Sequence, residues 1–148
     1  MLTKKTRAQI SERQTTGRPD IPARIAHPSR CTSHPPVHWW RTRRPQDFEA
    51  TDVRILRAKL FKTDAIDDCD WLYAVTGNAA AAIGIAIRAL KQHGMTNPAI
   101  DAVVSAVLCC ALEGDGASKV LLLSALRRRQ KIDPRCRHLV LLWSDKDI

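Results

Sequence analysis

NPAIDAVVSAVLCCALEG, residues 97–114, is the stretch that indicates the fold most clearly. Asn97 is a favourable helix cap, and Pro98 suits the first helical position, where its missing amide donor is no loss. Apolar residues then recur at steps of three and one, which is the spacing of an amphipathic helix that faces a core. Gly114 is placed to end the helix in a left-handed conformation. The apolar stripe consists of Ile100, Val103, Val104, Val107, Leu108, Ala111 and Leu112.

Two further helices are predicted before this stretch. The first covers roughly residues 47–61 and would bury its large apolar side chains. The second begins near the acidic cluster Asp67, Asp68 and Asp70 and runs to His93, with Gly94 as its stop, because acids at the start and bases at the end match the helix dipole. Its small central side chains would let the helix over 98–113 approach closely. The residues expected to be buried in the first helix are Phe48, Val53, Leu56, Leu60 and Phe61.

Two more elements follow Gly114. Asp115 or Ser118 is expected to cap a helix that ends with Arg127, Arg128 and Arg129, whose cations would lie beside unpaired carbonyl groups. The segment 134–143 has a cap-plus-proline start, Asp133-Pro134, which favours a helix. Its apolar run over 139–143 fits a strand equally well. We expect a helix, because a single strand would have no partner elsewhere in the chain.

The first third of the chain differs from the rest in composition. Residues 1–47 hold ten basic and three acidic side chains, whereas residues 48–148 hold fourteen and twelve. The same segment contains six of the eight prolines and few large apolar residues. Such a segment buries too little surface to offset its ordering entropy. We therefore predict a disordered basic arm over 1–47, or a translation start that lies further along, followed by an all-α domain of four to five helices over 48–148.

Composition also limits the class of protein. The longest stretch without a charged side chain is the 17 residues of 71–87, and a spanning helix needs about 20. The N-terminus does not lead into the apolar stretch of a secretory signal, so we expect a cytoplasmic protein. The five cysteines form no CxxC pair and are expected to be reduced thiols. We therefore expect one small domain without a membrane span.

No motif in the chain defines a catalytic or metal site. Cys109 and Cys110 lie within the apolar helix and are expected to pack in the core, since reactive thiols need an electropositive setting. The prolines around residues 27–38 prevent the helix that would align His27, Cys31, His34 and His38 as zinc ligands. Capping and dipole effects account for the carboxylates Asp64, Asp67, Asp68 and Asp70 without an ion. We expect no cofactor, no metal and no catalytic activity.

Basic clusters are the most distinctive candidate sites. One combines indole rings with guanidinium groups, which can stack on unpaired bases and neutralise phosphates. The other would gather where the last two helices meet. The helix after Gly114 is mostly apolar over residues 119–126 and is expected to be buried. We therefore do not expect it to read a DNA sequence. The candidate nucleic-acid-binding residues are Trp39, Trp40, Arg41, Arg43 and Arg44 in the first cluster, and Arg127, Arg128, Arg129, Lys131, Arg135 and Arg137 in the second.

Two functions are compatible with these features. The first is a non-catalytic helical interaction protein whose core contacts another protein or a second copy of itself, because residues 120–123 and 139–143 are apolar on every side. The alternative is an accessory protein that binds nucleic acid without sequence specificity, through the basic arm and the C-terminal arginine cluster. An enzyme ranks below both.

Overall fold

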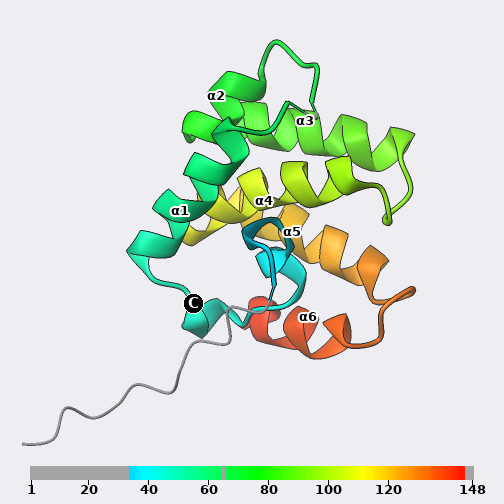
Figure 1. Ribbon diagram of the computed structural model, residues 1–148. Coiled ribbons are helices and arrows are strands. Elements are labelled where there is room, and N and C mark those ends of the chain that lie inside the picture. Colours follow the sequence, from blue (N-terminus) through cyan, green and yellow to red (C-terminus); the bar gives the residue numbers. More distant parts are fainter. Residues whose placement is uncertain (1–33, 65, 146–148) are drawn as a thin grey trace, which may run out of the picture. The chain divides into compact units, whose positions relative to one another are not determined.

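The computed structural model describes residues 34–64 and 66–145, and these residues form helices without strands. The expectation of an all-α bundle is therefore confirmed (Figure 1). None of the described helices is both long and apolar enough to cross a membrane. The elements in chain order are the 3₁₀ turns η1 (Pro36–Arg41) and η2 (Pro45–Asp47) and the α-helices α1 (Ala50–Phe61), α2 (Trp71–Thr76), α3 (Ala79–Gln92), α4 (Pro98–Leu112), α5 (Gly116–Arg129) and α6 (Cys136–Ser144).

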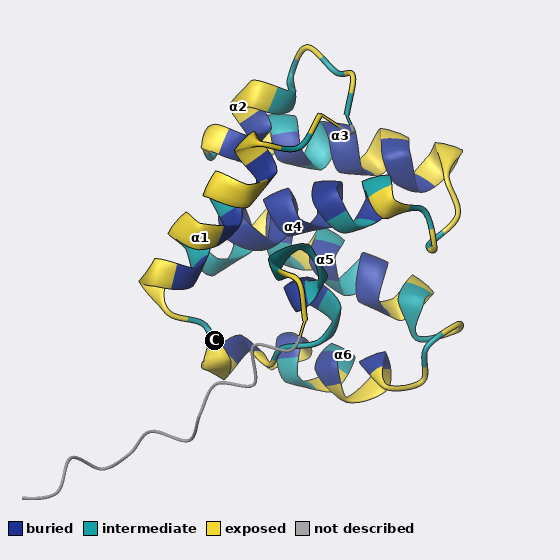
Figure 2. Ribbon diagram, in the orientation of Figure 1, coloured by how far each residue is buried: buried dark blue, intermediate teal, exposed yellow. Residues whose placement is uncertain are grey.

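Helix α4 is the centre of the domain. It packs against α3 on one side and α5 on the other, and it also contacts α1 and η1. Every residue from 102 to 110 is buried, so the helix is covered all round in its middle (Figure 2). The predicted cap is present, since Asn97 Oδ1 accepts a hydrogen bond from the Ala99 amide at 2.9 Å. The stretch that indicated the fold is thus the element around which the others pack.

The long helix expected up to His93 is two helices in the structure. Gly77 has a φ of 110°, a left-handed conformation that ends α2. Asn78 then caps α3, and its Oδ1 accepts a hydrogen bond from the Ala81 amide at 3.0 Å. The Gly-Asn pair therefore combines a stop signal with a start signal in the middle of the expected helix. This split is one reason why six α-helices are described where four to five were expected.

The two helices after Gly114 form much as predicted. Asp115 caps α5, with its Oδ1 accepting from the Ser118 amide at 2.6 Å. The segment that also fitted a strand is helix α6, which packs against α5 and buries Leu139 and Trp143. In α1 the expected burial of Leu56 and Leu60 is confirmed, whereas Phe61 is exposed because it lies at the end of the helix.

The packed domain begins before residue 48. Trp40 is fully buried and Trp39 nearly so, and both side chains lie in the same core as α4. The turn η1 is fixed to α4, where Ser105 Oγ donates to the Val37 carbonyl oxygen at 2.9 Å. This differs from the expected arm over 1–47, because two indole rings supply the apolar surface that the segment otherwise lacks. Residues 1–33 lie outside the described part of the chain, where the arm remains a prediction.

Candidate functional site

The first predicted cluster is centred on one carboxylate. Asp101, in the first turn of α4, accepts the Trp40 indole N–H at 2.9 Å and a bidentate pair from Arg41 at 2.9 and 3.2 Å. His38 Nε2 lies 3.3 Å from Oδ2 of Asp101. Desolvation and the neighbouring Arg41 cation lower the pKa of His38 below its usual value, and Asp101 only partly offsets this. Asp101 thus fixes η1 to α4.

Arg43 is also occupied within the domain. Its guanidinium lies 4.6 Å from the ring centres of both Trp39 and Phe48, which is cation–π distance. The same group forms an ion pair with buried Asp52 at 3.2 Å. Asp52 in turn accepts the Glu49 amide at 2.9 Å at the start of α1. The indoles and Arg43 therefore hold the turn segment on α1 and do not form a free stacking surface.

The structure consequently divides the predicted nucleic-acid site. Of the first cluster, only Arg44 is exposed. Arg41 and Arg129 both lie near His38, so the fold does bring one residue of each cluster together. Arg41 is directed at Asp101, however, and Arg129 donates to the Met95 carbonyl oxygen at 2.6 Å. The interior position of the indoles depends on contacts 60 and more residues away, and no sequence pattern indicated them.

The second predicted cluster is largely exposed. We call residues 127–137 the basic turn, which runs from the end of α5 to the start of α6. Arg128 donates to the Leu90 carbonyl oxygen at 3.1 Å and so ties this turn to the end of α3. Within the described ranges, four further basic side chains are exposed and form no ion pair, namely Arg127, Lys131, Arg135 and Arg137. Ile132, an apolar side chain among them, is 54% exposed.

A shallow groove of about 430 Å³ lies between α2 and α3. We call it the α2–α3 groove. Tyr73, which is 61% exposed, forms part of its wall. Ala80, Ala81 and Gly84 line it with small side chains, and Asp70 and Arg88 supply its charged groups. Leu72, next to Tyr73 in the same helix, is also exposed. From the sequence these small residues were expected only to contact the helix over 98–113, and their open side was not predicted.

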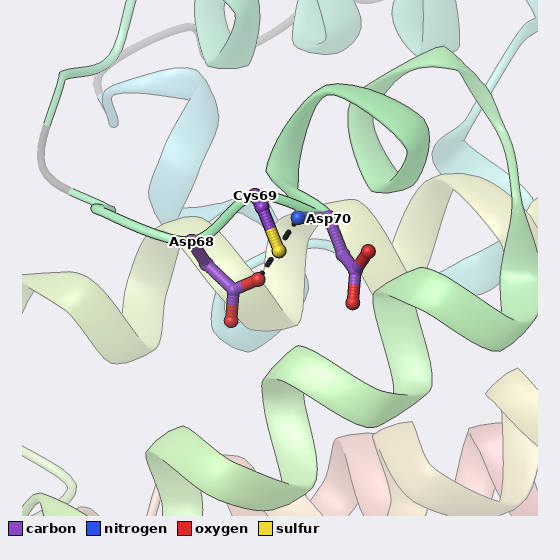
Figure 3. Close-up of side chains that lie close together, drawn as sticks. All are labelled: Asp68, Cys69 and Asp70. Atoms are coloured by element: carbon purple, nitrogen blue, oxygen red, sulfur yellow. Dashed lines mark hydrogen bonds between the residues drawn. The ribbon is translucent and has the colours of Figure 1, made fainter.

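The acidic segment before α2 places three potential ligand groups together. The ligand atoms of Asp68, Cys69 and Asp70 lie within 4.8 Å of one another (Figure 3). Arg88 Nη2 already lies 2.6 Å from Asp68 and 3.9 Å from Asp70. This hydrogen bond and the bond from the Asp70 amide lower the pKa of Asp68. Arg88 therefore compensates these carboxylates, and Asp68 also accepts the Asp70 amide directly before α2. The sequence had predicted capping and dipole compensation for them, without Arg88 as a partner.

The thiols of the core are poor candidates for chemistry. Burial raises the pKa of Cys109 to about 12 and also raises the pKa of Cys110. Cys136 is buried too, and its Sγ lies 3.7 Å from the Arg41 carbonyl oxygen. These contacts agree with the expected packing role. Of the residues considered as zinc ligands, those at 27 and 31 lie outside the described ranges, and His38 is directed at Asp101.

Comparisons with known proteins identify no relative. No family model matches the chain, and neither the curated proteins nor the solved structures contain a match to it. The candidate sites are two exposed surfaces, the basic turn and the α2–α3 groove, and one internal polar network around Asp101.

Proposed function

We propose that the chain is a non-catalytic interaction protein whose helical domain binds another protein or a second copy of itself. The observation that carries the proposal is the set of large apolar side chains left exposed on the helices. Val120 on α5 and Leu141 on α6 are 67% and 70% exposed, and Tyr73 is 61% exposed beside the α2–α3 groove. Tyrosine is among the residues enriched at interface hot spots, and the buried core of an interface is more apolar than the rest of a protein surface.

The positions of the polar groups support the same proposal. Charged and titratable side chains in and just after η1 have acidic partners within the domain. His38 and Arg41 lie against Asp101, and Arg43 lies against Asp52. The buried cysteine thiols have raised pKa values, which disfavours the thiolate that a nucleophile requires. The exposed apolar side chains therefore remain as accessible features that can contact a partner protein.

Site-specific photo-crosslinking in cells tests this function. A photoreactive amino acid replaces Tyr73, Val120 or Leu141, and the crosslinked products are identified by mass spectrometry. We expect at least one position to give a defined product with one protein, which is either this chain or another. Exposed Thr51 on α1 serves as the control position. If none of the three positions gives a product above that control, the proposed function is overturned.

The exposed basic turn favours a second candidate function, which is binding of nucleic acid without sequence specificity. Arg127, Lys131, Arg135 and Arg137 are free to neutralise phosphates. A salt titration of DNA binding by the full chain tests it, with Arg135→Glu and Arg137→Glu as variants. Loss of each phosphate contact should lower the salt slope by about one. Unchanged binding and slope in both variants would contradict a role for this turn.

A further inference from the structure

We propose that a second copy of this chain occupies the α2–α3 groove, with its basic turn as the inserted element. The inference rests on the proposed function and specifies its partner. One chain then carries both halves of the contact, because the groove and the turn are separate surfaces of the same domain. Ile132 would enter the groove beside Tyr73, and the bases around it would lie near the acids that border the groove.

The shape of the groove suits an inserted side chain. Its small side chains, Ala80, Ala81 and Gly84, leave room between α2 and α3, and Tyr73 offers an aromatic wall. An added Cβ on Gly84 would meet only Arg88 Nη1 within 4 Å, at 3.5 Å, so the space above this glycine is open. A half-exposed isoleucine gains free energy when its remaining apolar surface leaves water in such a place.

Charge complementarity identifies the occupant. Asp70 lines the groove, the Asp68 carboxylate lies within 4.8 Å of the Asp70 carboxylate, and among the described residues Arg88 is the one cation that the groove sets against these two acids. The basic turn carries six bases and one acid in eleven residues, and four of those bases have no ion-pair partner among the described residues. Facing surfaces of opposite sign attract each other and exclude partners of the wrong charge. The turn also combines this charge with an exposed apolar side chain, as the groove requires.

The two surfaces can be used at the same time. Tyr73 and Ala80 lie near the start of α3, whereas Arg128 ties the basic turn to the Leu90 carbonyl oxygen near its end (Figure 1). The contact joins two different surfaces, so in an arrangement that does not close into a two-fold pair or a ring each added copy leaves one groove and one turn free. Association is therefore expected to continue beyond a dimer as the concentration rises, and to weaken at high salt, which screens the charges.

A complementation experiment with the full chain tests the inference. Gly84→Leu fills the groove, and Ile132→Glu removes the inserted side chain and adds a repelling charge. We expect the unmodified chain to form oligomers whose mean mass rises with concentration, and each variant alone to associate at least tenfold more weakly. An equimolar mixture of the two variants should restore a dimer and nothing larger, because each retains one intact surface. Sedimentation velocity provides the masses.

Two controls keep the interpretation clear. Ala58→Leu and Ile55→Glu make matched changes at exposed positions of α1 and should leave association unchanged. Circular dichroism should show that Gly84→Leu is at least as stable as the original chain, because glycine is unfavourable inside a helix. A monomeric original chain, variants that still associate, or a mixture that stays monomeric would each overturn the inference. Crosslinks to a different protein would also overturn it while supporting the proposed function.

Discussion

Replacing Trp40 tests whether the segment before α1 is part of the folded domain. The side chain is fully buried, and its indole N–H donates to Asp101 at 2.9 Å. Removing a buried tryptophan ring in Trp40→Ala should cost about 3–5 kcal/mol of unfolding free energy. Trp40→Phe keeps most of the apolar surface but loses the hydrogen bond to a charged acceptor, which contributes about 1.5–3 kcal/mol. Arg41 remains on that carboxylate, so we expect about 2 kcal/mol.

Chemical denaturation followed by far-UV circular dichroism measures both values, because the helical signal does not depend on the indole. Arg44→Ala is the matched control, since Arg44 is exposed in the same segment and its loss should change stability by less than about 0.5 kcal/mol. If Trp40→Phe and Trp40→Ala both cost no more than this control, the segment is not held by its tryptophan and residues 36–47 are not part of the folded domain.

Three further changes probe other parts of the domain. The lowered pKa of His38 means that the unfolded chain binds more protons just below pH 6.5, so stability should fall with decreasing pH there. His38→Gln should reduce that slope in denaturation curves, and an unchanged slope would contradict the assignment. Thiol labelling of the native chain, with the labelled sites located by mass spectrometry, should modify exposed Cys69 quickly and leave Cys109 unmodified until the chain unfolds. Rapid labelling of Cys109 would show that α4 is accessible to the reagent in the native state. Gly77→Ala should cost about 1–2 kcal/mol because of the left-handed backbone. The loss should exceed that of Gly114→Ala, which shares the left-handed backbone, because an added Cβ at Gly77 would lie 2.7 Å from Arg57 Nη2 whereas at Gly114 it meets open space. Equal losses in thermal or urea unfolding would show that the crowding beside Gly77 is relieved without cost.

Local signals in the sequence predicted the helices well where a cap, a stripe and a stop agreed. Residues 97–114 have all three, and α4 begins and ends almost where they indicate. The Gly77-Asn78 pair carries the same kind of local signal, but the dipole pattern from residue 67 to residue 93 obscured it. The predicted single helix followed the dipole pattern, whereas in the structure the cap at Asn78 starts a separate helix.

The candidate sites were predicted less well, because their environment depends on distant residues. Arg41 and Arg135 look alike in the sequence, yet one is directed at Asp101 and the other is exposed without an ion pair in the described part of the chain. The α2–α3 groove combines residues from two helices that the sequence joined into one. The sequence shows where a charged or aromatic residue stands in the chain. Whether its side chain is exposed depends on which other residues pack against it.

The sequence by itself determined the helical class, the cap at Asn97 and the core-facing stripe of α4, because capping and apolar periodicity act within a few residues. Only the structure shows that α4 is buried on all sides in its middle and that Asp115 caps α5. The tertiary structure alone decided that Trp39 and Trp40 are core side chains, that Asp101 gathers the first basic cluster, and that the basic turn and the α2–α3 groove face outward. Each of these outcomes depends on surfaces brought together from distant parts of the chain, and such surfaces exist only after the helices have packed.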